Sequence, residues 1–186
     1  MKKQFILFSL SILLFIGCTN QNISSNNNLP NQQPVSTLFD DSEDDSNAIE
    51  YSIFLIALED KGLNGKEIGC GDSVVSVIQT SPEKSPTDSE LMSEAFTTLL
   101  NFKNPDHTQS AYNNFLDKST LKLVSAEIIN GVAKVELSGQ ISSGGVCDDP
   151  RIIAQLEETA AQFPEVQSVE IFINNKPLRQ IFNLKG

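Results

Sequence analysis

Chain length and acidic composition limit the classes of protein to which this sequence can belong. The chain has 186 residues, a formal net charge of −11, three cysteines and one histidine. This length suits one domain with flanking segments. Lys and Arg form no cluster, which argues against nucleic acid as a partner, because affinity for phosphate backbones comes chiefly from these residues. The same balance argues against tight adhesion to anionic lipid headgroups.

Residues 1–17 predict an export signal peptide. Two lysines precede an uncharged, largely apolar run, Phe5 to Ile16, that is too short to span a bilayer comfortably. The motif Phe15-Ile16-Gly17-Cys18 resembles the lipobox of bacterial lipoproteins, in which the chain is cut just before a lipid-modified cysteine. We therefore expect Cys18 to be acylated, with palmitate among the chains, and to hold the protein at the extracytoplasmic face of a bacterial membrane. A plain secretory signal and an uncleaved signal anchor are the alternatives.

Residues 18–49 predict a lipidated N-terminus followed by a disordered polar and acidic tether. Asn, Gln, Ser and Pro dominate this stretch, which cannot bury enough apolar surface to offset its ordering entropy. Asp40, Ser42 and Asp44 have the alternate spacing of the start of a calcium-binding EF-hand loop. The sixth position of such a loop requires glycine and the twelfth requires glutamate, but these are Asp45 and Tyr51 here. The acidic cluster is therefore interpreted as a solvated linker.

Residues 50–186 predict one folded domain, which begins with two strands and a helix. The nearly continuous apolar run at 51–58 suits a strand buried on both faces, and the β-branched stretch at 73–79 suits a second strand. Ser85 is the predicted helix cap, with Pro86 in the first turn and Asp88 completing a capping box. The helix ends at Asn104-Pro105. Its apolar stripe consists of Leu91, Met92, Ala95, Phe96, Leu99 and Leu100.

The second half of the domain predicts a hairpin, a helix and a final strand. Residues 121–129 and 132–137 flank Asn130-Gly131, which supplies the two positive φ angles of a tight two-residue turn. Asp149 is the predicted cap of a helix with Pro150 in its first turn, and residues 166–173 predict the last strand, followed by an extended piece over 176–182. The segment 104–118 is mostly polar, with a short helical turn predicted around its aromatic residues. The predicted fold is an α+β sandwich in which two helices pack on one face of a single mixed sheet.

Several spaced motifs resemble the GerMN domain, known from sporulation and spore-germination lipoproteins. They are the Asn130–Ser138 stretch, the glycine-rich segment ending in Cys147, the Gln162–Val169 stretch and the Ile173–Pro177 turn. The resemblance covers most of the chain from residue 51 to 182. It implies a compact fold similar to ring-building motifs, with no catalytic residues and no cofactor. It also implies a domain that meets envelope proteins or further copies of itself. A germination role is not implied, because nothing in the sequence shows that the organism forms spores.

Cys70 and Cys147 predict a disulfide. Thiols that occur in pairs outside the cytoplasm are usually oxidised, and each of these cysteines lies in a glycine-containing loop, one before the second strand and the other before the second helix. Loops at neighbouring ends of a sheet and a helix can meet at bonding distance. The rival interpretations are a catalytic thiol, which would require the single histidine, His107, as its base, and a zinc site, which would lack two ligands. We expect neither, and His107 is expected at the surface.

No other cluster predicts chemistry. Glu157 and Glu158 are adjacent on a helix and point apart, and Ser142-Ser143-Gly144-Gly145 lacks the lysine of a phosphate loop. The expected function is therefore non-catalytic protein–protein interaction or assembly in the cell envelope, with no small-molecule substrate, no metal and no nucleic acid. A cell-wall glycan or peptide ligand is the alternative, for which Tyr112 and Phe115 are the loop candidates, and a thiol enzyme ranks third.

Overall fold

The computed structural model describes residues 48–105 and 111–182. Its elements follow in the order strand, strand, helix, hairpin, helix, strand, as predicted, with four short elements added. The bounds are β1 Glu50–Ala57, β2 Lys66–Glu67, a 3-10 turn at Gly69–Gly71, β3 Ser73–Thr80, α1 Asp88–Asn101, β4 Lys122–Ile129, β5 Val132–Ser138, α2 Asp148–Ala161, β6 Ser168–Ile173, β7 Lys176–Pro177 and α3 Leu178–Ile181.

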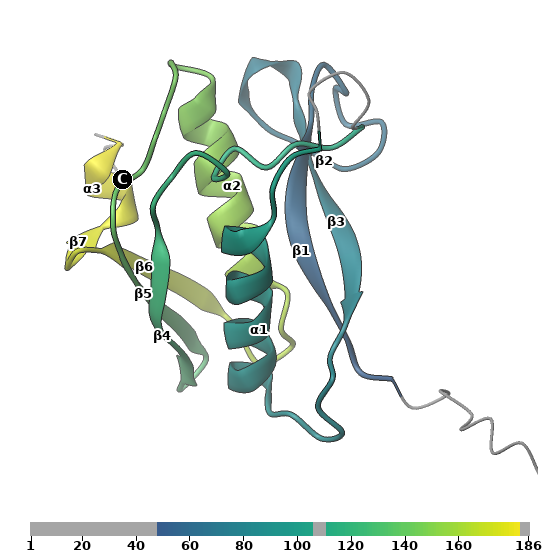
Figure 1. Ribbon diagram of the computed structural model, residues 1–186, viewed down its shortest axis with the longest axis vertical. Coiled ribbons are helices and arrows are strands. Elements are labelled where there is room, and N and C mark those ends of the chain that lie inside the picture. The colour runs from purple at the N-terminus through teal and green to yellow at the C-terminus, as the bar shows by residue number, and fades with distance from the viewer. Residues whose placement is uncertain (1–47, 106–110, 183–186) are drawn as a thin grey trace, which may run out of the picture. The chain divides into compact units, whose positions relative to one another are not determined.

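The strands form two sheets with the two long helices between them (Figure 1). One sheet has the order β1-β3-β2 and is antiparallel, whereas the other has the order β4-β5-β6-β7 and contains a parallel β5–β6 pair. One apolar core runs through all three layers and includes side chains from both sheets, such as Ile53 and Ile171, around the fully buried Phe96. The α+β class is confirmed.

The single mixed sheet of the prediction is replaced by two sheets because other groups occupy the outer edge of β1. The amide side chain of Gln162 accepts from the Ser52 N–H at 2.7 Å and donates to the Ser52 carbonyl at 2.9 Å. Gln155 donates to the Phe54 carbonyl at 2.8 Å, and Asn113 forms an isolated bridge with Ile56. A strand edge needs these backbone bonds, and here α2 and one loop supply them in place of a neighbouring strand.

The burial of β1 changes along its length. Its last residues, Leu55 to Ala57, are buried on both faces, as predicted for the whole strand. In the first part burial alternates, with Tyr51 and Ile53 buried and Ser52 and Phe54 only half-buried. β1 is therefore covered on one face along its whole length, and on both faces only near its C-terminal end.

Helix α1 begins two residues later than the predicted cap. The cap is Thr87, whose side chain accepts from the Glu90 N–H, while Glu90 accepts from the Thr87 N–H at 2.7 Å. The prediction of Ser85 as the cap is wrong. Thr87 is followed three residues later by a glutamate, and the two residues form the reciprocal hydrogen bonds of a capping box. These bonds from Thr87 hold the pKa of the Glu90 carboxyl below its usual value. Five of the six predicted stripe residues are buried, with Leu100 only half-buried.

We expect Thr87→Ala to lower the free energy of unfolding by about 1 kcal/mol, because an N-cap side chain satisfies an otherwise unpaired backbone N–H. Ser85→Ala is the matched control and should change it by less than about 0.5 kcal/mol. Chemical denaturation of the two variants checks this. Because the folded-state pKa of Glu90 is depressed, its contribution is present at neutral pH and is lost as the pH falls through that pKa, so the Thr87 effect should shrink in acid.

The hairpin prediction is confirmed. β4 pairs antiparallel with β5, and the connecting residues Asn130 and Gly131 have φ angles of 52° and 80°. The pairing shifts register between Leu123 and Ser125, so that Val124 lies in a bulge and is 61% exposed. The inner face of β5 is fully buried, as the alternation predicts.

The start of α2 and the C-terminal segment after β7 differ from the prediction. Cys147, not Asp149, is the N-cap of α2, because the Asp148 and Asp149 carboxylates bond back to the preceding loop, to the Gly144 N–H and the Ser143 hydroxyl. The predicted extended piece over 176–182 is wrong after Pro177, where the chain turns into α3. The predicted helical turn near Leu116 is a hydrogen-bonded turn, in which Leu116 is buried.

Candidate functional site

The structure joins Cys70 to Cys147 by a disulfide, with 5.8 Å between their Cα atoms and a sequence separation of 77. Cys18 and His107, which the sequence also singles out, lie outside the described residues. Cys70 lies in the 3-10 turn, where its φ of 66° is left-handed. The bond therefore connects the loop before β3 to the N-cap residue of α2, as the sequence predicts.

A buried ion pair lies beside the disulfide and connects the same two elements. The carboxylate of Asp72, whose side chain is only 1% exposed, accepts from Nε and Nη2 of Arg151 at 2.6 Å each. Its second oxygen accepts from the Glu59 N–H at 2.9 Å. Arg151 also bonds to Asp148 at 3.0 Å. Both carboxylates thus neutralise the guanidinium, and no group of this cluster is left without a partner.

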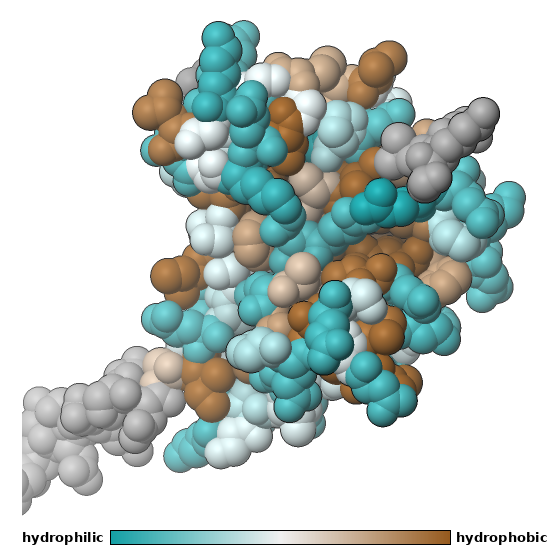
Figure 2. Space-filling model, turned by 180° about the vertical axis from the view of Figure 1, so that it is seen from behind, coloured by the Kyte–Doolittle hydropathy of each residue, from teal (hydrophilic) through white to brown (hydrophobic). Residues whose placement is uncertain are grey.

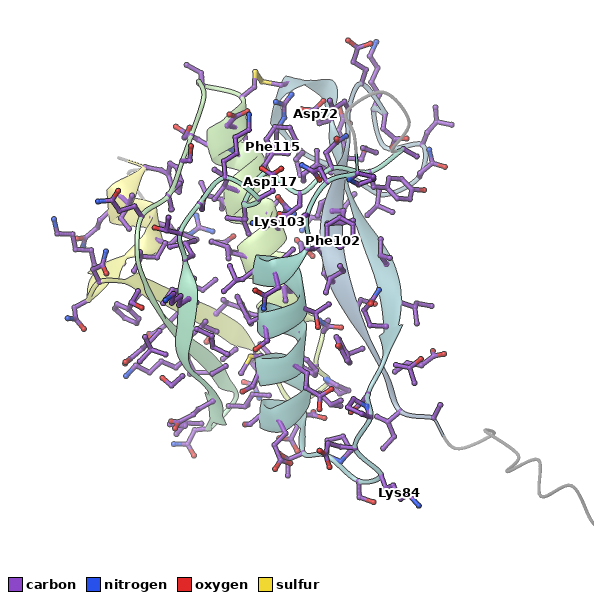
Figure 3. All side chains as sticks on the ribbon, viewed as in Figure 1. Asp72, Lys84, Phe102, Lys103, Phe115 and Asp117 are labelled. Carbon is purple, nitrogen blue, oxygen red and sulfur yellow. A yellow bond between two sulfur atoms is a disulfide. The ribbon has the colours of Figure 1, made fainter. Side chains whose placement is uncertain are left out.

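An aromatic ring covers the same guanidinium. The ring of Phe115 lies 4.5 Å from the central carbon of Arg151, which is within the range of a cation–π contact. Figure 3 shows Asp72 and Phe115 near the disulfide at one end of the domain, with Lys84 at the opposite end. Phe115, a predicted candidate for ligand stacking, is therefore already engaged on one side by a charge from α2.

A second polar network continues from this cluster into the core. Gln155 is fully buried on α2; its carbonyl oxygen accepts from the Phe115 N–H at 2.8 Å, and its amide donates to Asn114 Oδ1 at 3.1 Å. Asn114 in turn donates to the carbonyls of Leu99 and Phe102 at 2.9 Å each, next to the C-terminal end of α1. The loop around Asn114 is thus held by side-chain amides, and the network satisfies the last carbonyls of a helix.

A polar cleft of about 490 Å³ opens at this end of the domain. Its lining includes Asn113, Phe115 and Asp117 from one segment of the chain and Ser142 and Asp148 from another. Much of the lining is engaged within the protein: Asp117 accepts from the Asn104 amide at 2.8 Å, and Asp148 pairs with Arg151. The cleft offers hydrogen-bonding groups and an aromatic ring, and among its described lining residues no nucleophile is paired to a base.

The remaining predicted residues lie apart from this site. Glu157 pairs with Arg179 and Glu158 with Lys66, so the two carboxylates point in different directions as predicted. In the part of the chain that the structure describes, no group of three or more His, Cys, Asp or Glu side chains could hold a metal ion. None of the helices there is both long and apolar enough to cross a membrane.

The sequence reasoning missed the Asp72–Arg151 pair, Gln155, Gln162 and Asn114. Gln155 carried a signal, since it is a polar residue next to the buried stripe of α2. Asp72 and Arg151 are 79 residues apart, and neither carries a local pattern that names its partner.

The fold and this end of the domain define a disulfide-linked α+β module in which two helices lie between two sheets. The chain belongs to the Germane family, whose description is "Sporulation and spore germination". The model of this family matches residues 64–179. The resemblance to GerMN domains is thereby confirmed.

Solved structures that match this chain include GerMN domains. The tandem GerMN domains of the sporulation protein GerM from Bacillus subtilis match at a TM-score of 0.46 and 18% identity, covering 70% of this chain and 40% of that one. The first GerMN domain of the same protein matches at 0.43 and 18% identity, with 70% and 86% covered. A putative lipoprotein from Clostridium perfringens matches at 0.40 and 17% identity, with 70% and 78% covered. No curated protein matches the chain.

Proposed function

We propose that this protein is a lipid-anchored, extracytoplasmic member of the Germane family that acts through protein–protein contacts in the cell envelope and catalyses no reaction. The observation that carries the proposal is that the polar residues at the disulfide-linked end form hydrogen bonds within the protein. Asp72, Arg151, Gln155 and Asn114 are bonded to one another or to backbone groups, which suits a structural role. Membership of the Germane family is consistent with it.

The location outside the cytoplasm has two supports. The disulfide between Cys70 and Cys147 requires an oxidising compartment to persist, because cytosolic thiols are kept reduced. Cys18 follows a predicted export signal, at the position where lipoproteins are acylated. An acyl-bearing cysteine followed by a polar segment would hold the domain near the membrane and leave it free to contact neighbours. A germination role is not part of the proposal.

The test is crosslinking of the full chain in its own cells, followed by mass spectrometry that also determines the state of the three cysteines. We expect an acylated Cys18, a bridged Cys70–Cys147 pair and reproducible crosslinks to envelope proteins or to further copies. The Cys18→Ser variant is the control, and it should lose both the acyl mass and the membrane fraction. An unmodified Cys18, or crosslinks to wall fragments alone, would contradict the proposal.

The cleft beside Phe115 favours a second candidate, a binding domain for cell-wall glycan or peptide. Its volume of about 490 Å³ suits a small ligand, and its lining combines amides, carboxylates and an aromatic ring. Titration with soluble wall fragments, followed by the amide resonances of Asn113 to Asp117, distinguishes the two candidates. Saturable shifts in these residues alone favour a ligand, whereas unchanged spectra favour the protein–protein role.

A further inference from the structure

The outer edge of β3 is open from Ser76 to Thr80. β2 pairs with β3 only at Ser73 and Val74, so the rest of this edge faces no strand in the described part of the chain. β1 occupies the opposite edge along the full length of β3. The open stretch is bounded by β2 at one end and by Pro82 at the other.

The backbone groups on this edge are positioned for pairing. Ser52 and Ile56 of β1 turn both their N–H and C=O groups away from β3, toward Gln162 and Asn113. In an antiparallel ladder the residues opposite such positions also point outward. Ile78 faces Ser52 in the register, so Ile78, Ser76 and Thr80 direct their peptide groups to the open side. The Ile78 carbonyl accepts from the Gln79 side chain and keeps a second lone pair.

The edges of β1 and β4 are covered by other groups, and the edge of β6 is covered in part. Gln155, Gln162 and Asn113 close the edge of β1. On β4, Ser89 of α1 accepts from the Ile128 N–H at 3.0 Å, and a bulge interrupts the strand. On β6, the two-residue strand β7 pairs with Phe172 and Ile173, and the rest of that edge carries a charged residue, Glu170. Native proteins protect sheet edges with such devices, or with lysine and proline, because an open edge recruits another strand. The open stretch of β3 has none of them.

The open edge is also free of charge. No charged residue occurs from Ser73 to Ser81, although the chain carries a net charge of −11. Ile78 is 62% exposed, and apolar surface elsewhere is broken into separate patches by hydrophilic side chains in the view of Figure 2. Two copies of an acidic chain repel each other over most of their surface, so a neutral strand is where they can approach closely.

We propose that β3 pairs with β3 of a second copy of this chain, antiparallel and about a two-fold axis at Ile78. Ile78 then lies opposite Ile78 of the other copy, and Ser76 lies opposite Thr80. Both are pairings that stabilise strands, an isoleucine pair and a hydroxyl pair. The ladder is limited to five residues, because the chain leaves the strand where the Ser81 N–H bonds back to Ile49. The pairing joins two three-stranded sheets into one sheet of six and gives a closed dimer.

This inference rests on the proposed function, whose protein–protein contact it assigns to one surface and one partner. The test is oxidative crosslinking of the Ile78→Cys variant of the full chain in its native membrane. Opposite residues in a hydrogen-bonded antiparallel pair are about 5.5 Å apart at Cα, which a disulfide can span. We expect a dimer on non-reducing gels that disappears on reduction. Val124→Cys is the matched control, since Val124 is 61% exposed on a covered edge, and it should stay monomeric.

The register provides a stricter test. Thr80→Cys alone should not crosslink, because the two Thr80 positions would be about 14 Å apart along the strands. Coexpressed Ser76→Cys and Thr80→Cys chains should crosslink to each other. Ile78→Lys should weaken the dimer by about tenfold or more in sedimentation equilibrium, since it places like charges opposite each other, whereas Val124→Lys should not.

Equal crosslinking of Ile78→Cys and Val124→Cys would overturn the inference, as would a wild-type chain that stays monomeric in its membrane. Crosslinking of Ile78→Cys to a different protein would overturn it too, but would leave the proposed function standing. The acylation state of Cys18, read in the same samples, reports on the proposed function separately.

Discussion

Replacing Cys70 and Cys147 together with serine is expected to lower the free energy of unfolding by about 4 kcal/mol. The bond closes a loop of 77 residues in sequence separation, and a crosslink across so long a loop removes many conformations from the unfolded chain. Denaturation with guanidinium, with and without a reductant, measures the effect. Reduction of the wild type should produce the same loss.

The double serine variant should be insensitive to reductant, which makes it the control for side effects of the reducing agent. Asp72 and Arg151 still connect the same two elements, so we expect a folded variant with lower stability. A loss below about 1 kcal/mol would contradict the prediction and would mean that the crosslink removes little conformational freedom from the unfolded chain.

Replacing Arg151 with methionine is expected to lower the free energy of unfolding by about 3 kcal/mol. The Asp72 carboxylate, 1% exposed, would lose its cation and keep only the Glu59 N–H, and a buried charge without a partner is costly. Because 17% of the Arg151 side chain is exposed, the loss should lie at the lower end of the range for buried pairs.

Arg179→Met is the matched control for this prediction. Arg179 pairs with Glu157, but 60% of its side chain is exposed, so its removal should cost less than about 1 kcal/mol. Adding Asp72→Asn to Arg151→Met should recover part of the loss, because it removes the uncompensated charge. Equal losses for Arg151→Met and Arg179→Met would show that the buried pair contributes no more than a surface one.

The elements that could be predicted from the sequence are those whose signal is local. Asn130-Gly131 needs only its own backbone preference to make the hairpin, and the apolar spacing of α1 follows from the geometry of one helix. The disulfide needed one further argument, that two loop cysteines in an exported chain meet each other. The family resemblance rested on the same local motifs.

The features that could not be predicted depend on contacts between distant residues. The number of sheets is set by what closes the edge of β1, and this is decided by Gln162, which is 110 residues from Ser52 in sequence. Asp72 can be buried because Arg151 forms an ion pair with it, and the sequence around either residue does not identify the other as its partner. The helix cap was missed for a different reason: Ser85 and Thr87 are both good caps, and only the reciprocal bond with Glu90 decides between them.

The orientation of β1 determines how the domain responds to a mechanical load. β1 runs from Glu50 to Ala57 and pairs with β3 at all eight positions, while Gln162 and Asn113 form hydrogen bonds with its other edge. A pull through the residues that precede Glu50 acts along the strand axis and shears this ladder, so that many bonds share the force and must break together. Resistance to such a pull is governed by the rate of unfolding and not by equilibrium stability. We therefore expect the β1–β3 ladder to unfold more slowly under a pull along β1 than under a pull that separates its pairs one at a time.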